Sequence, residues 1–193
     1  MKRFCILLSG VVLIASCKKN DQPTPVDNKP MTYIDLKDSA VTFSHSASYD
    51  LNGDGEKDVL FSTLLVGDPI NKEDKKQWYV TSSFNASLPV EEGESIPVLN
   101  LADSIPVGNF NGYTWYNASS IILAQKVIGE VGDPIWQGDW KNAAHRFIPI
   151  QLKKTDGVYN GWIEVSFSTA NEKIILHKAA ISKQAGKAIA AGK

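Results

Sequence analysis

The chain has 193 residues, of which 43% are hydrophobic and 21% are charged, and its formal net charge is −1. A chain of this length and composition can bury one hydrophobic core, so we expect one folded domain. Its charge is too evenly balanced to give the clustered basic face that nucleic-acid binding requires, and we expect no nucleic-acid partner.

The first sixteen residues have the pattern of an export signal. Lys2 and Arg3 form a short positive region, and an apolar run over residues 4–15 follows. This run is too short to span a membrane, which takes about 20 apolar residues. It ends in Leu-Ile-Ala-Ser-Cys at residues 13–17, which resembles the lipobox of bacterial lipoproteins. An ordinary signal peptide with a chance cysteine is the alternative.

The lipobox resemblance implies cleavage after residue 16 and lipid on Cys17, which would anchor the protein to a membrane of the bacterial cell envelope, on the periplasmic side or at the cell surface. Cleavage removes Lys2 and Arg3, so the formal charge changes from −1 to −3. Cys5 leaves with the signal and Cys17 carries the lipid. The mature domain then has no free thiol, which excludes disulfides, cysteine-ligated zinc and a cysteine nucleophile.

Residues 17–32 are polar and contain three prolines without apolar periodicity. Such a segment cannot bury enough apolar surface to fold, so we predict a lipidated, disordered tether that joins the membrane to a domain over residues 33–193.

From Tyr33 onward the pattern predicts an all-β fold, an antiparallel β-sandwich. Short runs rich in Val, Ile, Thr and aromatic residues are bounded by Gly, Pro, Asn or Asp, and we predict strands at 58–66, 77–84, 113–116, 120–128, 146–152, 159–168 and 173–181. Turn residues separate the last three runs, which should form an antiparallel meander. A helical period is visible only over 183–191, which we expect to be a frayed tail.

Several segments near the C-terminus, residues 146–152, 159–164, 174–181 and 186–192, resemble a recurrent module of uncharacterised secreted bacterial proteins. The module has a Tyr-Gly-Trp strand, and here Asn160 stands between the tyrosine and Gly161. The resemblance implies a β fold and secretion but no activity. Gly161 would let a neighbouring strand approach its backbone closely; an ordinary packed strand is the alternative.

Residues 50–58 read Asp-Leu-Asn-Gly-Asp-Gly-Glu-Lys-Asp, which has the oxygen-ligand spacing of a calcium loop. The expected ligands are the side chains of Asp50, Asn52, Asp54 and Asp58 and the main-chain carbonyl of Glu56. Such hard oxygen ligands favour calcium over zinc or copper. The alternative is an Asx-rich turn that binds no ion.

An EF-hand would place a bidentate glutamate at the twelfth position of this loop, where the chain has Phe61 within the predicted strand 58–66. The loop therefore resembles the calcium hairpins of FG-GAP and integrin-type repeats. That resemblance implies a structural calcium ion in a loop flanked by strands. The missing bidentate ligand lowers the expected affinity, toward a dissociation constant of about 10⁻⁴ to 10⁻³ M.

Enzyme signatures are missing: the mature chain has no His-Glu-x-x-His, Gly-x-Ser-x-Gly, phosphate loop or Ser-x-x-Lys. His45, His145 and His177 are far apart in the sequence, and we predict surface or packed residues rather than ligands or bases. We therefore expect a non-enzymatic protein. A secreted hydrolase that uses carboxylates and a metal is the alternative.

Four aromatic residues in Gly- and Pro-containing surroundings are candidates to stack on a sugar or a peptide, namely Trp115, Tyr116, Trp136 and Trp140. Core packing is the alternative for each. Together with the acidic loop they predict an envelope-anchored, calcium-stabilised module that binds a glycan or a protein.

Two smaller patterns remain. Ser39 and Ser104 lie in Asp-Ser-aliphatic tripeptides, which resemble the O-glycosylation sites of exported Bacteroidetes proteins; turns are the alternative. The pentapeptide Val-Gly-Asp-Pro-Ile occurs at 66–70 and at 131–135, which indicates two similar turns at strand exits, or chance.

Overall fold

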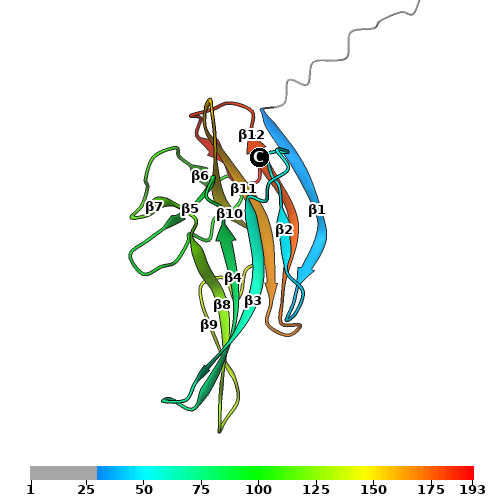
Figure 1. The fold of residues 1–193 in the computed structure, drawn as a ribbon, viewed down its shortest axis with the longest axis vertical. Coiled ribbons are helices and arrows are strands. Elements are labelled where there is room, and N and C mark those ends of the chain that lie inside the picture. The colour runs from blue at the N-terminus through cyan, green and yellow to red at the C-terminus, as the bar shows by residue number, and fades with distance from the viewer. Residues whose placement is uncertain (1–29) are drawn as a thin grey trace, which may run out of the picture.

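Residues 30–193 are described by the computed structural model, and they form two antiparallel β-sheets packed face to face (Figure 1). The predicted antiparallel β-sandwich is therefore confirmed. The described residues contain no helix of the length and hydropathy needed to cross a membrane. The export signal, Cys17 and most of the predicted tether lie outside this range.

The larger sheet has six strands in the order β1-β12-β11-β10-β5-β7. Their bounds are Met31–Val41 (β1), Lys173–Ser182 (β12), Gly157–Ser168 (β11), Arg146–Lys154 (β10), Ala86–Val90 (β5) and Thr114–Asn117 (β7). The smaller sheet has the order β2-β3-β4-β8-β9, with bounds Ala47–Tyr49 (β2), Val59–Asp68 (β3), Glu73–Ser82 (β4), Ser120–Gly129 (β8) and Ile135–Gln137 (β9). Two further short strands, β13 (Ile189–Ala190) and β6 (Ser104–Ile105), pair with each other.

All seven predicted strands are present, as β3, β4, β7, β8, β10, β11 and β12. The last three form the predicted antiparallel meander, because β11 pairs with β10 on one side and with β12 on the other. The fold begins earlier than predicted. Met31 pairs with Ser182 and is only 4% exposed, so Met31 and Thr32 belong to β1 rather than to the tether.

The main core lies between the two sheets. It is formed by the inward-facing positions of the strands, with Phe61 and Trp78 from the smaller sheet against Ile163 and Leu176 from the larger one, all fully buried. Every second side chain of a strand faces the same side of its sheet, so alternate residues of β11, such as Ile163, point into this core.

A second, smaller core covers part of the outer face of the larger sheet. Trp162 packs there with Phe147, Leu99, Ile105 and Ala191. The expectation of a frayed tail over 183–191 is wrong, because Ile189 and Ala190 form β13 and Ala191 is fully buried. Apolar burial and strand pairing hold the C-terminal residues in place. Neither could be predicted from the sequence, because β13 is too short to show a period.

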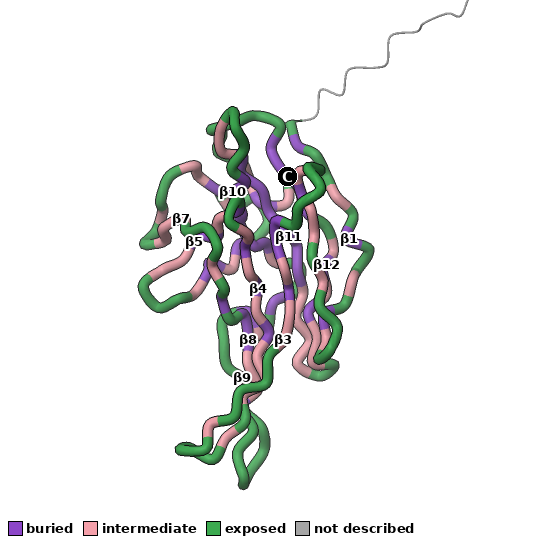
Figure 2. The backbone as a smooth tube through the Cα atoms, viewed as in Figure 1, coloured by how far each residue is buried: buried purple, intermediate pink, exposed green. Residues whose placement is uncertain are grey.

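One end of the smaller sheet extends beyond the larger sheet. The β3–β4 and β8–β9 hairpins project there as a narrow arm (Figure 1), and most residues at their ends are exposed (Figure 2). β3, β4 and β8 stay paired to the end of the arm, at Asp68↔Glu73 and Glu73↔Gly129. We call residues 64–75 and 127–135 the hairpin tip.

Candidate metal loop and the other predicted site residues

The acidic loop joins β2 to β3 and closes directly onto their pairing. The main-chain N–H of Asp58 donates to the carbonyl of Tyr49 at 2.8 Å, and Tyr49 faces Val59 in the next register position. The loop is thus fixed at both ends by one antiparallel pair. Ordering or disordering this loop should therefore affect the pairing at the start of β3.

The carboxylate of Asp50 holds the first half of the loop in a turn by accepting main-chain hydrogen bonds. It accepts hydrogen bonds from the main-chain N–H groups of Asn52 at 3.2 Å, Gly53 at 2.6 Å and Gly55 at 2.8 Å. The bond from Gly55 is the largest cause that lowers the pKa of Asp50. Gly53 and Gly55 have φ of +78° and +92°, a region that favours glycine.

The next two polar residues repeat this Asx-turn pattern. The side-chain oxygen of Asn52 accepts the N–H of Asp54 at 2.8 Å, and a carboxylate oxygen of Asp54 accepts the N–H of Glu56 at 2.9 Å. Each turn satisfies main-chain donors that would otherwise need water. The spacing that predicted calcium ligands therefore also builds a stable turn.

Asp58 is the one buried carboxylate of the loop, with 2% of its surface exposed. It accepts the main-chain N–H of Leu51 at 2.7 Å and the side-chain amide of Asn52 at 3.4 Å. Burial raises the pKa of Asp58, and the charges of Asp54 and Asp50 raise it further, while the bond from Leu51 opposes them. Ionised Asp58 is thus held in the fold at a cost that a nearby cation would offset.

The donor chemistry of the loop fits calcium, since every candidate ligand is a hard oxygen. Within residues 30–193, however, no group of three or more His, Cys, Asp or Glu side chains gathers closely enough to hold a metal ion. Coordination by this loop requires its acidic side chains to move closer together than they lie here. Lys153 and Lys154 share a surface hollow with Asn52 and Asp54, so solvent reaches the loop from that side.

The four candidate stacking residues do not form one surface. Trp140 is 2% exposed, and its indole N–H donates to the carbonyl of Ile96, so the prediction that it stacks on a ligand is wrong. Trp136 packs against Trp78 and Phe167 with ring centroids 5.3 and 5.5 Å apart, at the edge of the core. Both indoles pack against the core because burying their large apolar area stabilises the fold more than exposing it to water would.

Trp115 and Tyr116 lie on β7 in the other sheet. The Trp115 ring is half-buried against the second core, and its N–H donates to the carbonyl of Gly108 at 3.2 Å. Tyr116 is 55% exposed. Of the four, only Tyr116 presents most of its surface to solvent.

The two predicted glycosylation sites differ in accessibility. The Ser39 hydroxyl is half-buried and donates to the carbonyl of Leu36 at 2.6 Å. Ser104 is exposed on β6. Modification of either residue stays a prediction.

Two histidines that are far apart in the sequence meet in the fold. The rings of His145 and His177 stack with centroids 4.3 Å apart, and Asp38, Glu164 and Ser166 surround them. Sequence spacing could not reveal this, because the contact between the two rings depends on the register of β10, β11 and β12. His45 lies elsewhere, in a main-chain bridge with Thr42.

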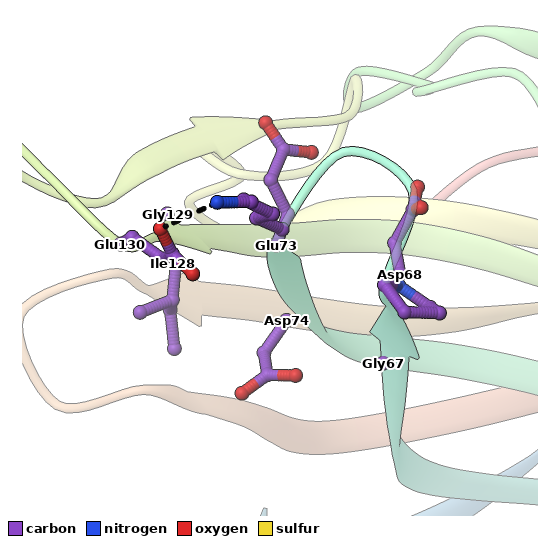
Figure 3. A pocket seen from close by; sticks show the side chains of 9 residues that line it. Gly67, Asp68, Glu73, Asp74, Ile128, Gly129 and Glu130 are labelled. Atoms are coloured by element: carbon purple, nitrogen blue, oxygen red, sulfur yellow. Dashed lines mark hydrogen bonds and ion pairs between the residues drawn. The ribbon is translucent and has the colours of Figure 1, made fainter.

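Both copies of the repeated pentapeptide lie at the hairpin tip. The first ends β3, as predicted for a strand exit, but the second leads into β9 at Ile135, so it is a strand entry. Between the two hairpins, the tip has a hollow of about 360 Å³ lined by Asp68, Lys72, Asp74 and Ile128, among others (Figure 3).

Comparison of the chain with protein-family models, with curated proteins and with solved structures found no match.

Proposed function

We propose that this chain is a lipid-anchored protein of the bacterial cell envelope whose β-sandwich is a calcium-stabilised binding module, and that it binds a protein partner through the hairpin tip. The observation that carries the proposal is the position of the tip. β1 begins at one end of the sandwich, and the two hairpins project from the opposite end (Figure 1). A lipid on Cys17 would enter the domain through β1, so the tip would point away from the membrane.

The hairpin tip presents apolar side chains that the fold does not need. Ile70 is 90% exposed and Val131 is 94% exposed. Leu64, Leu65 and Ile135 are each at least half exposed. Apolar side chains gathered at a projecting end are typical of a surface that a partner covers.

The edge of β3 supports a protein partner over a glycan. β2 pairs with β3 only as far as Ala47↔Phe61, so on the side of β3 away from β4 no described strand pairs with residues 62–68. This edge has neither lysine nor proline before Asp68 to block pairing. An open, apolar edge can accept an extended segment of another protein by β-strand addition.

The net charge of the hairpin tip indicates which charge the partner segment carries. The tip holds five carboxylates, from Asp68, Glu73, Asp74, Glu130 and Asp133, and two ammonium groups, from Lys72 and Lys75. Both lysines are already paired, with Glu130 at 3.4 Å and with Asp68 at 3.1 Å. The acidic excess favours a partner segment that is apolar and basic.

In this proposal, residues 50–58 bind calcium as a structural ion. The support is the charge of Asp50, Asp54 and Asp58 in one short loop, together with the raised pKa of the buried Asp58. An ion held there would stabilise the β2–β3 junction and with it the strand that forms the open edge.

Site-specific photocrosslinking of the anchored protein in its own cells tests the tip. A photoreactive residue at position 131 should give a discrete adduct, and a matched residue at Phe84, which is 77% exposed elsewhere on the domain, should not. Ile70→Asp should reduce the adduct at position 131 by at least about fivefold, because it places a charge in the apolar contact.

Protease digestion of the adduct separates the two ligand classes. Loss of the added mass with protease supports a protein partner, whereas a protease-resistant, glycosidase-sensitive mass contradicts it in favour of a glycan. Equal adducts at positions 131 and 84, or none at 131, would refute the tip as the binding surface.

A further inference from the structure

A polar cluster on the larger sheet contains a serine, a histidine and an aspartate that are joined by hydrogen bonds in that order. The Ser166 hydroxyl lies 2.8 Å from Nε2 of His177, and Nδ1 of His177 lies 2.6 Å from Oδ1 of Asp38. With the imidazole proton on Nδ1, His177 donates to Asp38 and accepts from Ser166. This is the hydrogen-bond order that a nucleophile, a general base and an orienting carboxylate require.

Irregular backbone brings these three side chains together. In β12, His177 is the extra residue between the pairs Glu164↔Lys178 and Val165↔Leu176. In β1, three residues between Asp35 and Ser39 lie opposite the same point. Two bulges thus meet at His177, and bulges often re-aim a side chain beside an active site.

Strained residues converge on the same place. Lys37 and Asp38 have φ of 59° and 50°, in a region that side-chain-bearing residues rarely adopt. His145 has φ of 49°, and its main-chain N–H donates to the Ser166 oxygen at 3.0 Å. Such strain persists where the surroundings fix it, and it clusters at functional sites.

The neighbouring charges hold the histidine pair in place. His145 stacks on His177, and its Nδ1 lies 2.7 Å from a carboxylate oxygen of Glu164, whose other oxygen pairs with Lys178 at 3.4 Å. The His177 side chain is 16% exposed, whereas those of His145 and Asp38 are 67% and 75% exposed. His177 is therefore packed against its neighbours, while His145 and Asp38 beside it are exposed to solvent.

We infer that Ser166, His177 and Asp38 form a nucleophilic site that hydrolyses carboxylic esters. Ser166 Oγ adds to the ester carbonyl while His177 Nε2 takes the hydroxyl proton. The bond to the leaving alcohol then breaks as His177 returns this proton to the alcohol oxygen. Water attacks the acyl-serine by the same proton route, which releases the acid and restores Ser166. Asp38 is a positioning residue in both steps.

Esters fit this site better than amides. The main-chain N–H of His145 donates to Ser166 Oγ, the attacking oxygen, and not to the position of the substrate's carbonyl oxygen, where the oxyanion forms. An amide needs stronger oxyanion stabilisation and protonation of a poorer leaving group. The expected activity is slow hydrolysis of esters with a good or moderate alcohol leaving group.

A fluorophosphonate probe tests the nucleophile directly, with peptide mapping to locate the label. Wild type should be labelled at Ser166, and Ser166→Ala should lose the label. Ser168→Ala is the matched control, two positions along the same strand, and should react like wild type. Hydrolysis of p-nitrophenyl acetate should follow the same order.

The positioning role of Asp38 has its own test. Asp38→Asn changes an exposed side chain and should leave the melting temperature unchanged, yet slow labelling by at least about tenfold. Asp38→Glu keeps the carboxylate and should label faster than Asp38→Asn, a rescue that a purely structural role of this side chain would not produce. Labelling of other serines, or labelling at Ser166 that is unaffected by Asp38→Asn, would show a structural hydrogen-bond network only and overturn the inference.

Discussion

At the scale of single residues, Glu172 joins the two sheets by charge. It lies in the turn between β11 and β12, and its carboxylate pairs with Lys76 of β4 at 2.6 Å and Lys126 of β8 at 2.5 Å. The bond from Lys126, and then the bond from Lys76, lowers the pKa of Glu172. Two partly buried lysines held by one carboxylate form a network, which is worth more than an isolated surface pair.

We predict that Glu172→Gln lowers the free energy of unfolding by about 0.5–1 kcal/mol at pH 7. Because folding lowers the pKa of Glu172, its stabilisation is present above the ordinary glutamate pKa and is lost as the pH falls below about 4. The difference between wild type and variant in urea titrations should therefore disappear near pH 3. Glu130→Gln is the control, since Glu130 and Lys72 are both about two-thirds exposed. Equal effects of the two variants would contradict the network.

Local features of the acidic loop were readable from the sequence. The Asp50–Asp58 spacing predicted calcium ligands, which stays a prediction. The turn named as its alternative is present, because the side chains of Asp50, Asn52, Asp54 and Asp58 accept main-chain N–H groups from residues nearby in the sequence. The prediction that Trp140 stacks on a ligand was wrong, because burial depends on contacts that are distant in the sequence; Trp136 is only partly buried, and stacking on a ligand stays a prediction for it. His145, Ser166 and His177 were unpredictable as a group, since only strand register brings them together.

At the scale of elements, regular two-residue alternation decided which strands were predictable. β10, β11 and β12 alternate clearly, whereas in β1 the bulge between Asp35 and Ser39 breaks the period. β5 contains Pro89, and β6 and β13 have two residues each, too short to show a period. Gly161 did mark a close approach: a Cβ there would lie 2.7 Å from the carbonyl oxygen of Ala180 on β12.

The acidic loop and the β2–β3 pair should be stabilised together by calcium. An ion that binds only the folded state raises the free energy of unfolding by about 1.4 kcal/mol at tenfold its dissociation constant. Millimolar calcium should therefore raise the melting temperature relative to chelator. Asp50→Asn with Asp54→Asn should abolish this shift, because the loss of two charged oxygen ligands removes most of the attraction for the ion.

A double change of equal charge at the hairpin tip, Glu130→Gln with Asp133→Asn, is the control and should keep the full calcium shift. An absent shift in wild type would leave residues 50–58 as an Asx-rich turn. A shift that survives the Asp50 and Asp54 changes would place the ion elsewhere.

At the scale of the whole molecule, the proposed function places the lipid anchor at one end of the sandwich and the binding surface at the other. Thirteen residues separate Cys17 from Met31, where β1 begins. If extended, this length reaches at most about 45 Å. The hairpin tip lies at the other end of the domain (Figure 1). A lipid on Cys17 would thus hold the domain near the membrane while its open edge faces outward.

Membrane attachment of the proposed lipoprotein should depend on Cys17. Cys17→Ser removes the thioether attachment and should move the protein from the membrane fraction to the soluble fraction, because the polar segment that follows has no apolar face to bind lipid. Electrostatics should not compensate, since a chain of formal charge −3 after cleavage is not attracted to anionic lipid. Cys5→Ser is the control: it changes a cysteine within the export signal and should leave the protein membrane-bound. Fractionation, with mass spectrometry of the mature N-terminus, measures both variants. A Cys17→Ser protein that stays with the membrane after a high-salt wash, with its signal removed, would contradict lipid anchoring and would instead require a membrane-binding surface on the sandwich itself.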